Sequence, residues 1–434
     1  MKVIYDISFF GLVEFYNIPP TGIYRVVGNL GRELIASDRC SISFGAFERD
    51  FFALADYHTL KHLFASSEYK EVYLPHFPNA ESHYESTCRM AQLNSRITAA
   101  SGLKKMGLKS ARKLNQLYRE LFDSDLNDEA DLQKAGIFHS PYFPIPTRIR
   151  KHKKLKPFLT VYDLIPILLP DFCSEPASGG QPYFKTIMDG IGREDWVVCI
   201  SQSTKDDLCG YRKDLDPRRI FVTHLGASNW FYPCKDSLTI EKVRSKYKIP
   251  PGRYVLSVCT FEPRKNLAHL IRCFAQLIQQ ERLSDLHLVL VGNLGWKYES
   301  IFSELTAKEG LRDRIIITGY VANEDLAALY SNALFFVFPS LYEGFGLPPL
   351  EAMQCGVPVI TSNTSSLPEV VGNAGITVDP QDGDALGQAM LRLAVDDNQR
   401  AELANKSLEQ ARQFSWAQCA NQTLKAYQTA VEQG

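Results

Sequence analysis

The sequence lacks the features that define several protein classes. Its ten cysteines are scattered and never form a Cys-x-x-Cys pair, so we expect buried free thiols rather than disulfide bonds or a zinc site. No apolar run approaches the ~18 residues that cross a membrane. Internal repeats and low-complexity tracts are absent as well. These absences favour a globular protein whose buried cysteines stay in the reduced, free-thiol form.

The chain also carries almost no net charge. Its formal charge is −1 at pH 7, which gives no overall attraction to nucleic acid or to an anionic membrane. The segment MKVIYDISFF reaches Asp6 before any apolar stretch of signal-peptide length. We therefore expect a cytoplasmic, non-spanning protein with no nucleic-acid partner. The length of 434 residues exceeds the ~100–200 residues of a typical domain, so two domains are expected.

From residue 254 onward, short apolar runs alternate with amphipathic segments. This pattern predicts a doubly wound parallel sheet, which binds ligands at the carboxyl ends of its strands. Helices are expected from Asn266, after Tyr298, from Asn323 and over 347–354. The expected strands are 254–259, 286–292, 314–319, 335–338, 357–361 and 375–378.

The first half is more irregular but contains comparable pieces. A helix is expected after Gly22, and we predict a second Rossmann-like domain. Polar residues, Pro and Gly interrupt the periodicity between Gly226 and Pro251, so we place the domain boundary there. The expected strands are 2–8, 137–143, 158–166, 196–201 and 219–226.

The segment FFVFPSLYEGFGLPPLEAMQCGVPVITSNTSSLPE (335–369) carries the strongest functional signal. It places Glu343 in a loop and Glu351 on the following helix, eight positions apart. Gly344 and Gly346 let the backbone approach a ligand closely, and free amides at the helix start suit a diphosphate. Both glutamates could instead be ordinary carboxylates favoured by the helix dipole.

A second motif, FEPRKNL (261–267), places two cations between a strand and a helix. Arg264 and Lys265 could face one anion together with the helix start, and a diphosphate suits that geometry. An isolated Arg-Lys pair is more often an exposed turn. The loops that carry this motif and Glu343 are expected at one edge of the sheet, and the exposed turn stays the alternative for the pair taken alone.

Together with ITGYV (317–321), SQSTKDDL (201–208), GIYRVV (22–27) and FSW (414–416), these motifs resemble the signature of retaining glycosyltransferases of family 4. The resemblance is dense over 254–380 and thin over 40–135. It implies the GT-B fold: an α/β protein with two Rossmann-like domains whose parallel sheets face each other across a cleft. It implies an acceptor-side domain of residues 1–226 completed by a crossover helix over 414–434, and a nucleotide-sugar domain of residues 227–413.

The same resemblance implies roles for particular residues. Glu351 would accept hydrogen bonds from ribose hydroxyls, and Glu343 would lie near the transferred sugar. Lys265 and Arg264 would stabilise the departing diphosphate, and His139 of IFHSPYF would contact the donor sugar. Many relatives have Arg at the position of Thr260, and Arg264 could take over its role here. Which of Lys265 and Arg264 contacts the diphosphate therefore stays open. The remaining implied donor contacts are Gly22, Thr260, Tyr320, Val321, Gly344, Phe345, Gly346 and Leu347.

The expected activity is retaining transfer of a hexose or deoxyhexose from a nucleoside diphosphate sugar, with GDP-mannose as the first guess for the donor. The acceptor would be a glycan, a lipid-linked sugar or a small molecule. The resemblance leaves open a catalytically silent sugar-nucleotide-binding or scaffold protein, and an epimerase or phosphorylase of the same fold. A covalent glycosyl intermediate on Glu343 also stays open.

Neither a cofactor nor a metal ion is expected. Asp-x-Asp pairs occur at Asp123/Asp125, Asp214/Asp216 and Asp382/Asp384, but none follows a clear strand end. Asp382 is predicted to cap the helix that begins near Ala385.

A predicted basic helix near 103–121 is a candidate for peripheral contact with the inner face of a membrane. Its alternative is a solvated face above a core-facing stripe that includes Met106 and Leu114. A second basic run covers Arg148 to Lys156.

Overall fold

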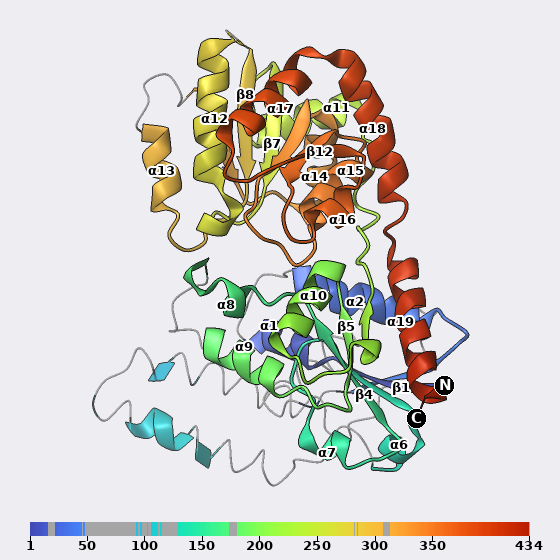
Figure 1. The fold of residues 1–434 in the computed structure, drawn as a ribbon. Helices are drawn as coiled ribbons and strands as arrows, with labels where there is room; N and C mark the ends of the chain where they lie inside the picture. Colours follow the sequence, from blue (N-terminus) through green and yellow to red (C-terminus); the bar gives the residue numbers. More distant parts are fainter. Residues whose placement is uncertain are drawn as a thin grey trace.

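The computed structural model describes residues 1–15, 22–45, 47, 129–172, 180–281, 283, 285–306 and 313–433, with scattered positions between 93 and 114. The molecule has two halves, one above the other in Figure 1, and each is built around a parallel sheet of six strands. Both have helices packed against them (Figure 1). The two Rossmann-like sheets of the GT-B fold are therefore present.

The first sheet has the order β2-β1-β3-β4-β5-β6. Its strand β2 was not predicted, because the pentapeptide SISFG carries little apolar signal. The strands are β1 (Lys2–Asp6), β2 (Ser41–Gly45), β3 (Ile137–Ser140), β4 (Lys156–Val161), β5 (Trp196–Cys199) and β6 (Ile220–Val222). The helices of this half are α1 (Ser8–Phe15), α2 (Gly22–Ile35), α6 (Glu129–Lys134), α7 (Thr147–Arg150), α8 (Ile165–Leu168), α9 (Gly180–Asp189) and α10 (Gln202–Tyr211).

The second sheet has the order β12-β11-β10-β7-β8-β9. Strands β7 and β10 are neighbours although three helices and two strands separate them in sequence. The strand order reverses between them, and this switch point is where doubly wound sheets bind ligands. The strands are β7 (Arg253–Val258), β8 (Leu286–Val291), β9 (Ile315–Gly319), β10 (Phe335–Phe338), β11 (Val359–Ser362) and β12 (Gly375–Val378).

The helices of the second half pack against this sheet or against one another. In α12, for example, apolar side chains such as Leu267, Leu270 and Phe274 recur at helical spacing and are buried. These helices are α11 (Ser237–Lys246), α12 (Leu267–Gln280), α13 (Glu299–Thr306), α14 (Asn323–Asn332), α15 (Leu347–Gln354), α16 (Leu367–Val371), α17 (Gly383–Val395) and α18 (Asp397–Ala411). Asp382 caps α17 by accepting a hydrogen bond from the Ala385 amide at 2.9 Å, as predicted.

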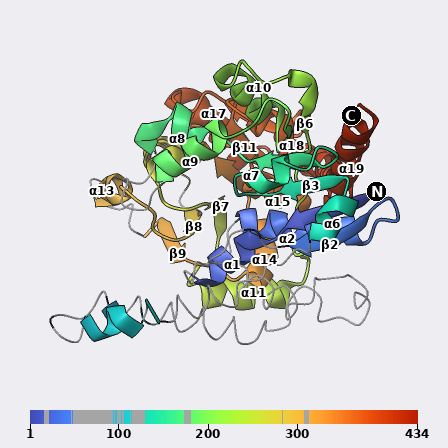
Figure 2. The same cartoon turned by 90° about the horizontal axis from the view of Figure 1, so that it is seen from below.

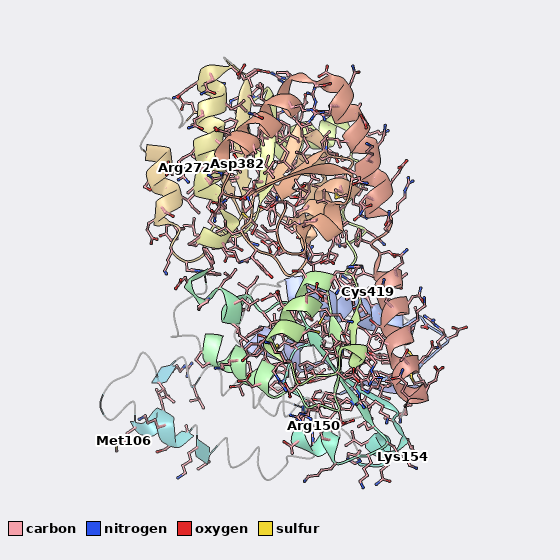
Figure 3. All side chains as sticks on the ribbon, in the orientation of Figure 1. Met106, Arg150, Lys154, Arg272, Asp382 and Cys419 are labelled. Atoms are coloured by element: carbon pink, nitrogen blue, oxygen red, sulfur yellow. The ribbon has the colours of Figure 1, made fainter. Side chains whose placement is uncertain are left out.

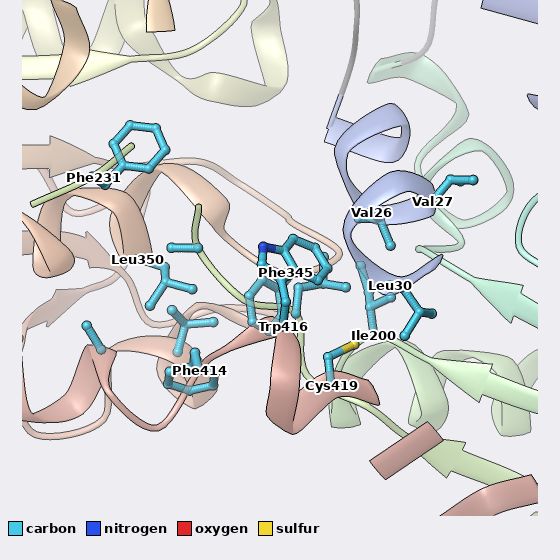
Figure 4. Packing of buried hydrophobic residues seen from close by; sticks show 14 of the residues in the cluster. Val26, Val27, Leu30, Ile200, Phe231, Phe345, Leu350, Phe414, Trp416 and Cys419 are labelled. Carbon is cyan, nitrogen blue, oxygen red and sulfur yellow. The ribbon is translucent and has the colours of Figure 1, made fainter. Parts of the chain in front are cut away.

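The last helix, α19 (Trp416–Glu432), leaves the second half of the chain and packs against α2 and β5 of the first (Figure 1). Viewed from below, both chain termini lie on the same side of the molecule (Figure 2). One buried hydrophobic cluster includes residues of both halves, among them Val26, Phe345, Trp416 and Cys419 (Figure 4). The two halves therefore share packed apolar surface.

The eight cysteines that the structure describes are all free thiols. Among the described residues, no helix is long and apolar enough to cross a membrane. Most of the basic segment 103–121 lies outside the described residues. Met106 and Leu114 are 65% and 74% exposed, so these two do not form the core-facing stripe (Figure 3). Membrane contact through this segment stays a prediction.

Candidate active site

A cavity of about 460 Å³ lies between the carboxyl ends of the two sheets. Its walls come from α2 and the loop after β4 on one side, and from the loops after β7, β8, β9 and β10 on the other. Most of the residues predicted for the donor site line this cavity. They are Gly22, Thr260, Lys265, Tyr320, Val321, Glu343, Gly344, Phe345, Gly346, Leu347 and Glu351.

The switch point of the second sheet brings Lys265 and Glu343 into contact. Lys265 ends the short 3-10 turn after β7, and Glu343 lies in the loop after β10. The Lys265 Nζ donates to Glu343 Oε1 at 2.5 Å, and the Ser340 hydroxyl donates to the same oxygen at 2.6 Å. Both charged side chains are only 12% exposed. The structure thus holds a buried carboxylate and a buried ammonium against the cavity.

Arg264 lies behind this pair. Its Nη1 is 2.9 Å from Glu343 Oε1 and donates to the Tyr342 carbonyl at 2.7 Å. Its Nη2 pairs with the buried Glu262. Arg264 is not among the residues that line the cavity, although the sequence placed it beside Lys265 as a donor contact. It supports the loop that carries Glu343.

The two cations control the charge of Glu343. Burial alone would raise the pKa of this carboxyl, but Lys265 and Arg264 outweigh burial and lower its pKa to about 2. Glu343 is therefore ionised at neutral pH. Its oxygens can stabilise positive charge that develops on a bound sugar.

Glu351 has different partners. In this structure its Oε1 accepts a hydrogen bond from Arg25 Nη1 at 2.8 Å, and its Oε2 accepts one from the Tyr330 hydroxyl at 3.2 Å. Burial raises the pKa of Glu351, and the charge of Arg25 opposes that rise. Because Arg25 belongs to α2, this ion pair joins the two halves across the cavity. Any ligand group that binds Glu351 Oε1 must share it with Arg25 or displace it.

The turn between β10 and α15 is shaped by its glycines. A Cβ on Gly344 would lie 2.3 Å from the Tyr162 carbonyl oxygen of the first half, so only glycine permits this close approach. Gly346 caps α15 with φ at 117°, a conformation that favours glycine. The Ser366 hydroxyl donates to the carbonyls of Glu343 and Phe345. The turn is held firmly, with the first amides of α15 at the cavity.

His139 is not among the residues that line this cavity, so its contact with the donor sugar stays a prediction without support from the lining. The side chain is fully buried, its Nδ1 pairs with the Tyr427 hydroxyl and its Nε2 is 2.8 Å from the Thr160 hydroxyl. Burial lowers the pKa of His139 to about 3, so the ring is neutral. His139 joins β3 and β4 to the crossover helix α19 and has a structural role.

Several cavity residues were missed. Tyr162 and Asp163 line the wall opposite Glu343, and burial raises the pKa of the Asp163 carboxyl. Arg25 of α2 and Asn293, which follows β8, also line the cavity and were not predicted as donor contacts. The signal for Tyr162 and Asp163 was their place directly after β4, at the ligand-binding edge of a parallel sheet.

Side chains of the second half also bind the N-terminus of α10. The Glu369 carboxylate accepts the backbone N–H groups of Gln202 and Ser203, each at 2.7 Å. His224 Nε2 lies 3.2 Å from the same carboxylate. The Tyr342 hydroxyl donates to Asp207 at 2.6 Å. These contacts hold α16 and the loop after β10 against α10 of the first half.

The Asp-x-Asp pairs do not form a metal site in the described part of the chain. Asp214 and Asp216 are paired with Arg212 and Arg218. No group of three or more His, Cys, Asp or Glu residues that could hold a metal ion is found among the described residues. Asp123 and Asp125 lie outside them. Metal independence stays a prediction.

Comparison with known proteins identifies relatives of this chain. Residues 239–410 match the family described as glycosyl transferases group 1. O-antigen chain mannosyltransferase B of Escherichia coli is 35% identical over 297 residues, which are 68% of this chain and 74% of that protein. The serotype-specific mannosyltransferase WbdA of Escherichia coli is 31% identical over 61% of this chain, but the match covers only 32% of WbdA.

Solved structures share the fold at low sequence identity. Sucrose-phosphate synthase of Thermosynechococcus elongatus superposes with a TM-score of 0.63 at 19% identity, covering 100% of this chain and 99% of that one. Anabaena HepE, solved in complex with UDP and glucose, has a TM-score of 0.61 at 16% identity, covering 99% and 100% of the two chains. Fold, site motifs and relatives agree: the chain belongs to the glycosyl transferases group 1 family and is a glycosyltransferase with the GT-B fold.

Proposed function

We propose that the protein transfers mannose from GDP-mannose to a glycan acceptor with retention of configuration and without a metal ion. The observation that supports this most strongly is the buried Lys265–Glu343 pair. It lines the same cavity as Glu351 and the N-terminus of α15. A nucleoside diphosphate sugar presents phosphate, ribose and hexose, and this cavity offers one protein group for each of them.

The diphosphate would bind Lys265 and the first amides of α15. A cation and a helix N-terminus are both suited to an anion, and together they stabilise a departing diphosphate without a metal ion. Gly22 starts α2 on the facing wall and adds a second set of free amides. Arg264 would act through Glu343 rather than by touching phosphate.

The ribose would bind Glu351. Its carboxylate can accept two hydrogen bonds from a pair of hydroxyls, for which Arg25 and Tyr330 stand in here. The base would then lie near Tyr320 and Val321, which line the same end of the cavity. Tyr320 is 63% exposed, so its ring is accessible for stacking.

The sugar would lie beside Glu343. In same-face transfer the C1–O bond to the diphosphate breaks while the acceptor oxygen bonds to C1, and the acceptor proton passes to the leaving phosphate. The ionised Glu343 would stabilise the positive charge on the ring, and Lys265 would stabilise the negative charge on the phosphate. In the alternative, Glu343 attacks C1 itself. Its hydrogen bonds to Lys265 and Ser340 reduce its nucleophilicity, which favours same-face transfer.

The donor sugar and the glycan acceptor are proposed from the relatives. O-antigen chain mannosyltransferase B and WbdA are both named as mannosyltransferases, and the name of the first also refers to O-antigen. The bound UDP in the HepE structure, by contrast, shows that this fold accepts other bases. The base must therefore be tested directly.

The test is thermal stabilisation of the purified protein by GDP, UDP, dTDP and ADP and by their sugars, with and without EDTA. A ligand present at 100 times its Kd adds about 2.7 kcal/mol of stability. We expect GDP and GDP-mannose to give the largest shift, unaffected by EDTA. A larger shift with another base, or loss of the shift in EDTA, would contradict the proposed donor or the metal independence.

Variants then separate binding from turnover. Glu351→Ala is expected to weaken GDP binding, whereas Glu343→Ala should retain GDP binding and lose turnover. Glu402→Ala, at an exposed ion pair on α18, is the control and should change neither. NMR of the product should show an α-mannoside. Equal activity of Glu343→Ala and the wild type would refute the role of Glu343.

A further inference from the structure

A second and larger cavity, of about 930 Å³, lies where the two halves are connected. One wall is α2, another is the segment 227–233 that leads out of the first half, and the third is the junction of α18 and α19. We call it the linker cavity. It shares no lining residue with the donor cavity, and its lining includes Asn29, Arg32, Trp230, Tyr232, Gln354 and Trp416.

The linker presents two aromatic faces to this cavity. Phe231 is buried at 2% exposure and packs edge-on against Tyr330, with ring centroids 5.8 Å apart. Ser331 further fixes the linker by donating to the Tyr232 carbonyl at 3.2 Å. Trp230 and Tyr232, on either side of this anchor, are 56% and 54% exposed. Two flat, accessible aromatic rings are therefore held on a fixed backbone.

The cavity walls also carry buried polar atoms that have no partner in the described part of the protein. The Trp416 indole N–H is one, in a side chain only 9% exposed, and the Gln354 side-chain oxygen is the other. Figure 4 shows Trp416 within the buried cluster, between Phe414 and Leu30. A buried donor and a buried acceptor without partners are costly unless a ligand or water satisfies them.

A smaller cavity of about 290 Å³ lies between the two larger ones. It shares Arg25 and Asn323 with the donor cavity, and Asn29 and Trp230 with the linker cavity. Arg25, Asn29 and Arg32 recur at helical spacing, so they lie along one face of α2. This face spans roughly 10 Å and forms a continuous polar wall.

We propose that the linker cavity binds a segment of a neutral glycan, apart from the site of transfer. Aromatic faces pack on the apolar faces of sugar rings, while amides, an indole N–H and a glutamine oxygen pair with hydroxyls, which both donate and accept. Glu33 lies beside Arg32 and Arg412 in the lining, so the cavity is not a simple anion site. Its volume is within the usual range for a ligand site.

The test is isothermal titration calorimetry of the full chain with mannose, α-linked mannotriose and α-linked mannopentaose. The choice of mannose rests on the proposed function; the site itself rests on the linker cavity. We expect mannopentaose to bind at least about tenfold tighter than mannose, because more rings contact the cavity. Trp230→Ala should weaken mannopentaose binding about tenfold or more, whereas Trp230→Phe, which keeps an aromatic face, should retain most of it.

Two controls keep the result specific. Trp296→Phe alters a tryptophan outside the linker cavity and should bind mannopentaose normally. GDP should stabilise Trp230→Ala as strongly as the wild type, which shows that the variant is folded and its donor site intact. Equal affinity for mannose and mannopentaose, or unchanged binding by Trp230→Ala, would overturn the inference. If GDP stabilises the protein but mannopentaose does not bind, the inference fails while the proposed donor site stands.

Discussion

The buried ionised state of Glu343 predicts a specific pH dependence of stability. Lys265 and Arg264 lower the pKa of this carboxyl from its ordinary value of 4.5 to about 2 in the folded protein. Because the folded-state pKa is the lower one, the carboxylate stabilises the fold above the ordinary value, and this stabilisation is lost as the pH falls toward 2. The side chain is 12% exposed, so solvent screening is small. The full effect is about 3 kcal/mol, of which about 2 kcal/mol disappears between pH 7 and pH 3.

The perturbation that tests this is Glu343→Gln, which keeps the shape of the side chain and cannot ionise. Urea unfolding of both proteins, followed by circular dichroism from pH 7 to pH 3, gives their difference in free energy of unfolding. We expect the advantage of the wild type over the variant to shrink by about 2 kcal/mol as the pH falls.

Glu351→Gln provides a control of opposite sign. Burial raises the pKa of Glu351, so this group stabilises the fold below its ordinary pKa and loses that effect as the pH rises through the raised value. The free energy of unfolding of the wild type should therefore rise relative to that of Glu351→Gln as the pH falls. A Glu343→Gln difference that stays constant within about 0.5 kcal/mol, or two variants that move in the same direction, would refute the electrostatic reasoning.

Three further outcomes are expected. His139→Leu should cost about 1–3 kcal/mol in urea unfolding, because the hydroxyl of Tyr427 loses its partner, with turnover unchanged where the protein is folded; a selective loss of turnover would instead support a catalytic role. Gly344→Ala should reduce turnover about tenfold or more, since its Cβ would overlap the Tyr162 carbonyl, and X-ray scattering should show the two halves farther apart. Asp382→Ala should cost about 1 kcal/mol through loss of the α17 cap and leave turnover intact.

The second half of the chain was predictable because its local signals agree with its fold. Residues 335–338 and 347–354 are a strand and a helix as predicted, since the first is wholly apolar and the second begins with two prolines. The rule that loops at the carboxyl ends of strands meet indicated where the donor cavity would lie, and the family resemblance indicated its individual residues. The roles proposed for them stay predictions.

The features that could not be predicted are contacts that the local sequence does not encode. A strand buried on both faces shows no alternation of polar and apolar residues, so the direction of the His139 side chain could not be read from IFHSPYF. Its partner Tyr427 lies 288 positions away in the chain. The ion pair between Arg25 and Glu351 spans 326 positions and was missed for the same reason.

The crossover helix has a consequence for the order in which the protein is made. Tyr427 of α19 is fully buried and packs edge-on against Phe158 of β4, at 4.9 Å between ring centroids. The ribosome finishes β6 roughly 190 residues before it begins α19, an interval of roughly 10–40 s at ordinary synthesis rates. Throughout this time Phe158 and His139 lack their contacts with Tyr427 of α19. The half that is synthesised first is thus completed last, and during translation it is the half that needs protection from aggregation.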